Sequence, residues 1–109
     1  MQKTNCPITN SLKLIGGKWK IAIIYNLMKG PTRFGELKKT LSPITQQMLT
    51  KQLRELERDL VVNRKVYEVV PPKVEYSLTD MGLSLRPVLN SWCKWGNENQ
   101  KLMQNIINK

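Results

Sequence analysis

The segment from residue 44 to residue 60, ITQQMLTKQLRELERDL, constrains the fold most, because it combines two chemistries at helical spacing. Apolar side chains recur every three or four residues, which predicts one amphipathic helix with a buried stripe. The stripe consists of Leu49, Leu53, Leu56 and Leu60. Thr45 suits the N-cap position, where its hydroxyl can accept a hydrogen bond from an N–H group of the first turn. A chain with this helix has to bury one of its faces and expose the other.

The outward face of this helix carries amides, a hydroxyl and cations. They are Gln46 and Gln47 in the first turn, Thr50 on the flank, and Lys51, Arg54 and Arg58. Glutamine can pair with adenine, and lysine or arginine can pair with guanine or hold a phosphate. The N–H groups of the first turn also favour an anion. Taken alone, the helix favours the simpler alternative of a solvated charged surface.

The charge of the chain favours a polyanionic partner. There are 18 basic and 8 acidic residues, for a formal net charge of +10, and the first 32 residues hold five lysines and no acid. Such a balance raises affinity for nucleic acid or an anionic membrane surface. The chain has no histidine, which excludes Ser-His-Asp and Cys-His catalysis and histidine-ligated metal sites. We therefore expect no enzyme, no catalytic or metal-binding residue and no cofactor.

The length of 109 residues predicts a single domain over residues 1–109. The apolar runs are too short to span a membrane, and the N-terminus lacks a secretory signal, so we expect a cytoplasmic protein with no membrane partner. Cys6 and Cys93 are too few for a disulfide framework.

The segments before residue 44 read as three short helices. Pro7 suits the first position of a helix that Gly16-Gly17 ends, and residues 18–29 restart as a second helix, so that residues 1–30 form an N-terminal helical part. Residues 33–41 read as a third helix capped by Thr32. A tight turn at Ser42-Pro43 then joins it to the central helix. This is the layout of a helix-turn-helix.

The residues after the central helix read as a β-hairpin. Residues 64–70 are rich in β-branched and aromatic side chains, residues 71–73 form a stiff turn, and residues 74–78 alternate as a returning strand. A hairpin directly after a reading helix is a wing, which completes a winged helix-turn-helix over residues 31–78. Lys73 at its tip would contact a phosphate or the minor groove. An ordinary surface hairpin is the alternative.

Residues 79–109 read as C-terminal helices with a long apolar stripe. Thr79-Asp80 caps the region, and Pro87 interrupts it unless it lies in a first turn. The stripe consists of Leu85, Val88, Leu89, Trp92, Trp95, Leu102, Met103, Ile106 and Ile107. Exposed, such a stripe would promote aggregation, so we expect a homodimer paired through the N- and C-terminal helices. Packing onto the same subunit is the alternative.

Five motifs, CPITNSLKLIGGKW, RFGELKK, ITQQMLTKQLRELERD, VPPKVEYSLTDMG and WCKWG, together carry a family resemblance. From Cys6 to about Gly96 the chain resembles the HxlR family of bacterial winged-helix transcriptional regulators, which is related to the MarR-type repressors. The resemblance implies a mainly α-helical homodimer with a β-hairpin wing that binds a pseudo-palindromic operator in double-stranded DNA. It places Gln46, Gln47, Thr50, Lys51 and Arg54 on the recognition helix and Lys73 in the wing. Where the family has glycine after the recognition helix, this chain has Leu60, which could lengthen the helix.

The resemblance also implies a role for Cys6. Many members sense electrophiles or oxidants through a cysteine in a CP dipeptide near the N-terminus, and Cys6 occupies that position. A helix N-terminus and the nearby Lys3 and Lys18 would both lower the pKa of its thiol. Position alone leaves an incidental thiol equally open. Cys93 reads as a core or interface residue, and a Cys6–Cys93 disulfide between subunits stays open.

These expectations combine into a homodimeric repressor whose operator binding is modulated by thiol modification of Cys6. Base contacts would come from Gln46, Gln47, Thr50 and Arg54, and phosphate contacts from Lys38, Lys39, Arg64, Lys65 and Lys73. One alternative is a regulator whose ligand binds at the dimer interface among Trp19, Trp92 and Trp95, with Cys6 incidental. Another is a protein that binds membranes or nucleic acid by charge alone.

Overall fold

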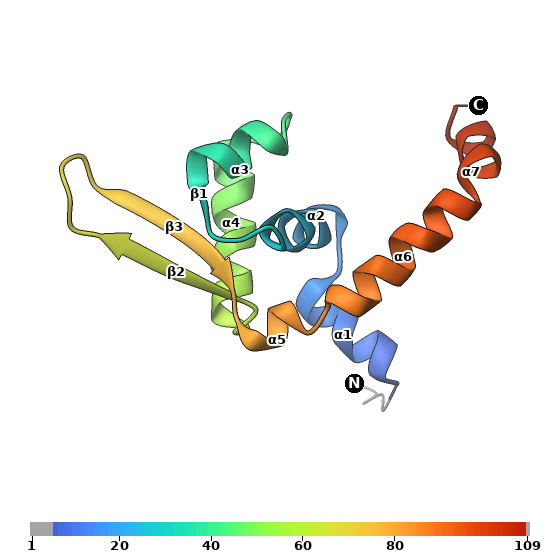
Figure 1. Cartoon of the computed structure of the whole chain (residues 1–109), viewed down its shortest axis with the longest axis horizontal. Helices are drawn as coiled ribbons and strands as arrows, with labels where there is room; N and C mark the ends of the chain where they lie inside the picture. Colours follow the sequence, from blue (N-terminus) through green and yellow to red (C-terminus); the bar gives the residue numbers. More distant parts are fainter. Residues whose placement is uncertain (1–5, 109) are drawn as a thin grey trace.

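A computed structural model describes residues 6–108 of the chain (Figure 1). The elements in chain order are α1 (Pro7–Ile15), α2 (Lys18–Leu27), β1 (Thr32–Arg33), α3 (Phe34–Thr40), α4 (Gln46–Arg58), β2 (Val62–Tyr67), β3 (Lys73–Leu78), α5 (Asp80–Leu83), α6 (Arg86–Glu98) and α7 (Gln100–Ile107). The three strands form one antiparallel sheet in the order β1-β3-β2. The fold is therefore mainly α-helical with a small β-wing, and the predicted winged helix-turn-helix is confirmed. No helix within the described range is long and apolar enough to cross a membrane.

The central helix α4 forms as its sequence predicts. The Met48 N–H donates to the Thr45 hydroxyl at 3.1 Å, which is the predicted N-cap. Leu49, Leu53 and Leu56 are at most 1% exposed, so three of the four predicted stripe residues are buried, whereas Leu60 lies beyond the end of the helix and is 71% exposed. The helix is shorter than the predicted segment, because it begins at Gln46 and ends at Arg58.

The end of α4 differs from the prediction. The Val61 N–H donates to the Leu56 carbonyl at 2.9 Å, and the Leu60 N–H donates to the Glu57 carbonyl at 3.1 Å. This pair of hydrogen bonds is a Schellman C-cap, which requires a left-handed residue. Leu60 takes that conformation, with φ of +63°. The hypothesis that the missing glycine lengthens the helix is therefore wrong, and the leucine instead accepts a strain of about 1–2 kcal/mol.

One hydrophobic core lies between α2, α3, α4 and the sheet. Its buried residues are Ile23, Ile24, Leu27, Leu37, Leu41, Ile44, Leu49, Leu53, Leu56, Val61, Val62, Tyr76, Leu78 and Leu89. Among them, only Leu89 comes from the helices after residue 85. We call residues 18–85 the reading head and α6 with α7 the arm. Figure 1 shows the arm projecting from the head on the side opposite the wing.

The wing is larger than the predicted hairpin. Thr32 was expected to cap α3 but lies in β1, where it pairs with Tyr76, and Arg33 takes the cap position instead. Because a two-residue strand has no alternation to detect, its sequence gives no signal. β2 starts and ends earlier than predicted. Lys73 is the first residue of β3 rather than part of the turn, so the tip of the wing consists of residues 68–72.

The arm is largely uncovered in the single chain. Thr79 caps α5 as predicted, since the Gly82 N–H donates to its hydroxyl at 3.1 Å. Pro87 lies in the first turn of α6, where it is tolerated. The apolar side chains exposed along the arm are Val88, Trp92, Trp95, Leu102, Ile106 and Ile107. Six of the nine residues of the predicted stripe are thus exposed, whereas Leu89 is buried and Leu85 and Met103 are half-buried.

Candidate nucleic-acid interface

The outward face of α4 brings the predicted reading residues together. Gln46, Gln47, Lys51 and Arg54 are exposed, and Thr50 is half-buried. With Glu55, these five side chains line a surface hollow of about 590 Å³. A face with this mixture of amide, hydroxyl and cationic groups can hydrogen-bond both base edges and phosphates.

A second hollow, of about 560 Å³, separates α4 from α3 and the wing. It is lined by Phe34, Gln46, Thr50, Arg54, Glu57, Arg64, Val74 and Tyr76. Arg54 from the helix and Arg64 from β2 therefore border the same groove. The sequence placed both among the DNA contacts, and the structure shows that they share one concave surface.

The cations of the wing are divided between its two faces. Neighbouring side chains of a strand point to opposite faces. Arg64 pairs with Tyr76, which also lines the groove, so Arg64 belongs to the face toward α4. Lys65 pairs with Glu75 on the other face. The predicted contacts Arg64 and Lys65 therefore address different sides of the wing.

The outer face of the wing is organised around Tyr67. The ammonium groups of Lys65 and Lys73 lie 4.8 Å and 4.5 Å from the centroid of its ring. The Tyr67 hydroxyl donates to Glu75 Oε1 at 3.1 Å, and Lys73 Nζ is 3.7 Å from Glu75 Oε2. Lys73 therefore already contacts an aromatic ring and a carboxylate. The sequence had predicted that it lies at the tip of the wing, with its charge directed to DNA.

Two further predicted cations lie on α3. Lys38 and Lys39 are exposed in its last turn, and neither lines the groove between α4 and the wing. Neither takes part in an ion pair within residues 6–108. Their charges are therefore available to a phosphate backbone.

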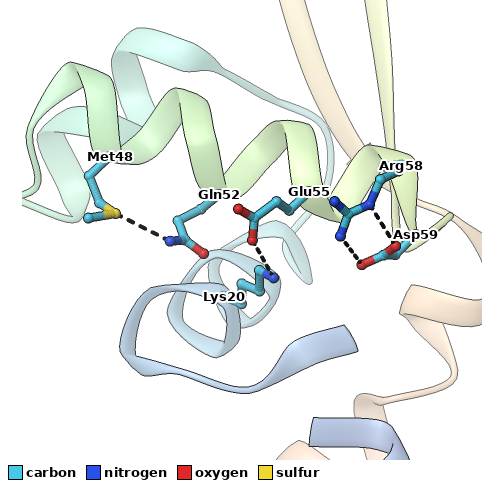
Figure 2. A network of polar contacts seen from close by, with 6 residues as sticks. All are labelled: Lys20, Met48, Gln52, Glu55, Arg58 and Asp59. Atoms are coloured by element: carbon cyan, nitrogen blue, oxygen red, sulfur yellow. Dashed lines mark hydrogen bonds and ion pairs between the residues drawn. The ribbon is translucent and has the colours of Figure 1, made fainter. Parts of the chain in front are cut away.

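Two ion pairs on α4 were only partly expected from the sequence (Figure 2). Arg58 donates twice to the Asp59 carboxylate, at 3.1 Å for each hydrogen bond, which lowers the pKa of Asp59. Lys20 Nζ of α2 lies 2.8 Å from Glu55 Oε1. Arg58 and Asp59 are neighbours in the sequence, so their pairing follows from local spacing, whereas no local pattern marks Lys20 as the partner of Glu55. The sequence indicates only that Lys20 faces the core, because it lies three residues before the buried residue Ile23.

Cys6 is exposed at the N-cap of α1. The pKa of its thiol is lowered chiefly by the backbone N–H of Thr9, and further by the Thr9 side chain and the Ile8 backbone. The predicted effect of the helix N-terminus is therefore present. Lys3 lies outside the described residues, and the Lys18 ammonium lies over the ring of Trp19, 4.7 Å from its centroid.

Cys93 lies beside an apolar cavity of about 290 Å³ between α2 and α6. The cavity is lined by Lys18, Ile21, Ala22, Tyr25, Leu89, Trp92 and Cys93. A hydrogen bond between Tyr25 and the Cys93 side chain raises the pKa of Tyr25. Cys93 is exposed, so it is not a core residue of the single chain. Of the tryptophans considered for a ligand site, Trp92 lines this cavity, whereas Trp19 packs against the core and Trp95 is 57% exposed.

Comparison with known proteins agrees with this architecture. The profile of the HxlR-like helix-turn-helix family matches residues 14–104. The HTH-type transcriptional regulator YdeP of Bacillus subtilis is 55% identical over 91 residues, covering 84% of this chain and 71% of YdeP. The redox regulator HypR in its oxidized form is 50% identical with a TM-score of 0.81, covering 86% of this chain and 97% of HypR. Reduced YodB, a transcriptional regulator from B. subtilis, is 38% identical with a TM-score of 0.76, covering 87% of this chain and 94% of YodB. The chain belongs to the HxlR-like helix-turn-helix family of transcriptional regulators.

Proposed function

We propose that the chain is a homodimeric repressor that binds a pseudo-palindromic operator and responds to thiol modification of Cys6. The observation that carries the DNA-binding part is the exposed set of amide, hydroxyl and guanidinium groups on α4, beside the groove shared with the wing. In this proposal α4 enters the major groove, where Gln46, Gln47, Thr50 and Arg54 contact base edges.

Phosphate contacts would fix the position of the protein on the duplex. The proposed set is Lys38, Lys39, Lys51, Arg64, Lys65 and Lys73. Because Lys73 is held by Tyr67 and Glu75, we expect it to contribute less than Lys38 or Lys39. The net charge of +10 supports binding that weakens steeply as salt rises.

The exposed apolar surface supports a homodimer. Apolar side chains are exposed on α1 as well as on the arm: Ile8 is 72% exposed and Leu12 is 56% exposed. A monomeric soluble protein rarely leaves such a continuous apolar surface in water. Pairing through α1 and the arm would give two reading heads, which fits half-sites about 34 Å apart, one helical turn of DNA.

The reading face is tested by changing Arg54 to alanine. An operator fragment is first located by DNase footprinting upstream of the protein's own gene. In a mobility-shift assay, Arg54→Ala should weaken binding to it by about 1–3 kcal/mol, the value of a good base contact. Lys94→Ala is the matched control, since Lys94 is exposed on α6, away from the groove. Equal losses in the two variants would argue against α4 as the reader.

The geometry of Cys6 supports the response to oxidants or electrophiles. The reactive form of cysteine is the thiolate, and the lowered pKa raises its share near neutral pH. Exposure at the start of α1 leaves the sulfur accessible, and α1 is part of the proposed dimer surface. Modification would therefore change how the two heads are spaced. The likeness to HypR, named a redox regulator, supports the same function.

A serine substitution tests this role. Cys6→Ser should bind the operator like the wild type but lose its response to diamide or a quinone. Cys93→Ser is the control and should keep the response. In Cys93→Ser, alkylation of Cys6 should accelerate as pH rises, with a midpoint below that of an ordinary thiol, because the folded pKa is lowered. A Cys6→Ser protein that still dissociates from DNA on oxidation contradicts the proposal.

The cavity beside Trp92 favours a second candidate, a ligand that binds near the dimer interface while Cys6 is incidental. Its volume of about 290 Å³ is at the small end of ligand sites. The two candidates separate in one comparison. If Trp92→Ala abolishes the response to the inducer and Cys6→Ser preserves it, the ligand interpretation holds.

A further inference from the structure

Lys20 is a buried lysine. Within the described residues it forms one ion pair, with Glu55. Its side chain is 10% exposed, and its Nζ lies 2.8 Å from Glu55 Oε1, as Figure 2 shows. Lysine is almost never buried unless it is paired. The pair joins α2, which does not carry any of the predicted DNA contacts, to the helix that carries half of them.

Glu55 stands at the edge of the DNA-reading surface. It lines the same hollow as Gln47 and Lys51. Its carboxylate is a negative charge on the face that is proposed to bind DNA, where it would repel phosphates. Lys51 precedes Glu55 by four residues, the spacing at which side chains of a helix meet. Lys51 and Arg58 both contribute to the lowered pKa of Glu55, after the larger effects of the Lys20 hydrogen bond and charge. The spacing of one helical turn puts Lys51 on the same face of α4 as this carboxylate.

The other neighbour of Glu55 is already committed. Arg58 makes two hydrogen bonds of 3.1 Å to Asp59, so its guanidinium is already occupied by that carboxylate (Figure 2). If Lys20 were absent, Lys51 would be the cation left to neutralise Glu55. A lysine paired with a carboxylate on its own helix is less available to a DNA phosphate.

We propose that Lys20 is a positioning residue for DNA binding, which holds Glu55 so that Lys51 remains available to the duplex. The inference rests on the proposed DNA-binding function and deepens it, because it assigns a role to a side chain that does not touch DNA. Lys20 both neutralises the carboxylate and anchors it at the α2 side of α4. Without it, the reading face would gain one negative charge and lose one positive charge.

The direct test is Lys20→Met, which keeps the length of the side chain and removes its charge. Binding is measured at several salt concentrations, on the footprinted operator and on a duplex of unrelated sequence. We expect roughly tenfold weaker binding to both duplexes and a salt slope smaller by about 0.9, the values for one lost phosphate contact. Lys29→Met is the matched control, since Lys29 is exposed just after α2 and has the same charge. It should change affinity and slope little.

The decisive measurement uses the double variant Lys20→Met/Glu55→Gln. Unfolding curves are recorded for every protein. Removing the acid frees Lys51, so the double variant should regain most of the lost affinity and the wild-type slope, even if it is less stable. If Lys20→Met does not fold, Glu55→Asp replaces it, because the shorter side chain keeps the charge but cannot reach Lys20, and the same loss is expected.

Two results would overturn the inference. One is binding by Lys20→Met equal to that of Lys29→Met, which would leave the pair a purely structural one. The other is a double variant that stays as weak as Lys20→Met. Failure of the underlying function looks different: the wild type would show no preference for the operator, and Arg54→Ala would have no effect on it.

Discussion

The reading head and the arm treat their apolar side chains in opposite ways. In the head, Ile23 is 0% exposed and Leu53 is 1% exposed. In the arm, Trp95 is 57% exposed and Ile107 is 70% exposed. Leu89, at the root of the arm, is the one residue of the arm in the core. The head therefore buries its apolar side chains within one chain, whereas the arm leaves most of its own exposed.

This difference predicts which properties depend on protein concentration. A core residue of the head stabilises a single chain, so its loss is felt at any concentration. In the proposed dimer, a residue of the arm stabilises the association of two chains, so its effect follows mass action. Substitutions in the two regions should therefore separate in experiments that vary concentration.

The largest effect is expected for Leu53→Ala in the head. Removing a buried leucine side chain costs about 2–5 kcal/mol, through lost burial and the cavity that remains. Urea unfolding at two protein concentrations should show this loss at both. The same truncation at Leu102, which is 61% exposed, should lower stability mainly at the higher concentration, where dimers form. Equal and concentration-independent losses in both variants would erase the distinction between head and arm.

A charge on the arm should break the dimer while sparing the head. Trp95→Glu places a carboxylate in the exposed stripe, and loss of a central aromatic residue costs at least ~2 kcal/mol of association free energy. Sedimentation should show monomers, and operator affinity should fall because two half-sites are no longer bound together. Val66→Glu is the control for sedimentation only, since Val66 is 48% exposed but lies in the wing, on the face that carries the proposed DNA contact Arg64. A Trp95→Glu protein that sediments like the wild type would place the interface elsewhere.

Gly82 lies in α5, which joins the head to the arm. We expect that adding a methyl group at this residue lowers the stability of the fold. A Cβ at Gly82 would lie 2.5 Å from the Val61 carbonyl oxygen and 3.1 Å from Leu78 Cδ2. Because backbone cannot move aside easily, Gly82→Ala should cost about 1–3 kcal/mol of stability, as overpacking does. Gly35→Ala in α3 is the matched control, because a Cβ there meets no described atom within 4 Å. Similar thermal midpoints for the two variants would contradict this account.

The sequence predicts the features that depend on near neighbours. The caps at Thr45 and Thr79, the proline in the first turn of α6 and the buried face of α4 follow from local rules of helix formation. The reading residues of the candidate site were predictable for the same reason. They lie on one helix, whose periodicity fixes which side chains share a face.

The features that depend on distant parts of the chain were not predictable. Alternation alone shows that Arg64 and Lys65 face opposite sides of the wing, but the pairing of Arg64 with Tyr76 decides which side faces α4. The Lys20–Glu55 pair joins residues 35 positions apart, which no local pattern records. The apolar surface of the arm was visible as a stripe, but periodicity does not say what covers it.

The smallest effect, and a gain, is expected for Leu60→Gly at the end of α4. The helix cannot extend there, because the Thr79 hydroxyl lies 2.7 Å from the Leu60 carbonyl, and the Thr79 N–H donates to Val61 at 3.0 Å. These contacts hold Leu60 left-handed. Glycine would relieve about 1–2 kcal/mol of strain but lose about 0.5–1 kcal/mol through chain entropy, so a net gain of up to ~1.5 kcal/mol remains.

Leu60→Ala separates strain from side-chain loss, because alanine keeps the unfavourable left-handed conformation and should give no gain. Little burial is sacrificed in either variant, since Leu60 is 71% exposed. Chemical denaturation at a low protein concentration, where the head is observed without the arm's partner, measures both. If Leu60→Gly instead weakened association, this exposed leucine would belong to the interface, and the boundary between a complete head and an incomplete arm would have to move to the end of α4.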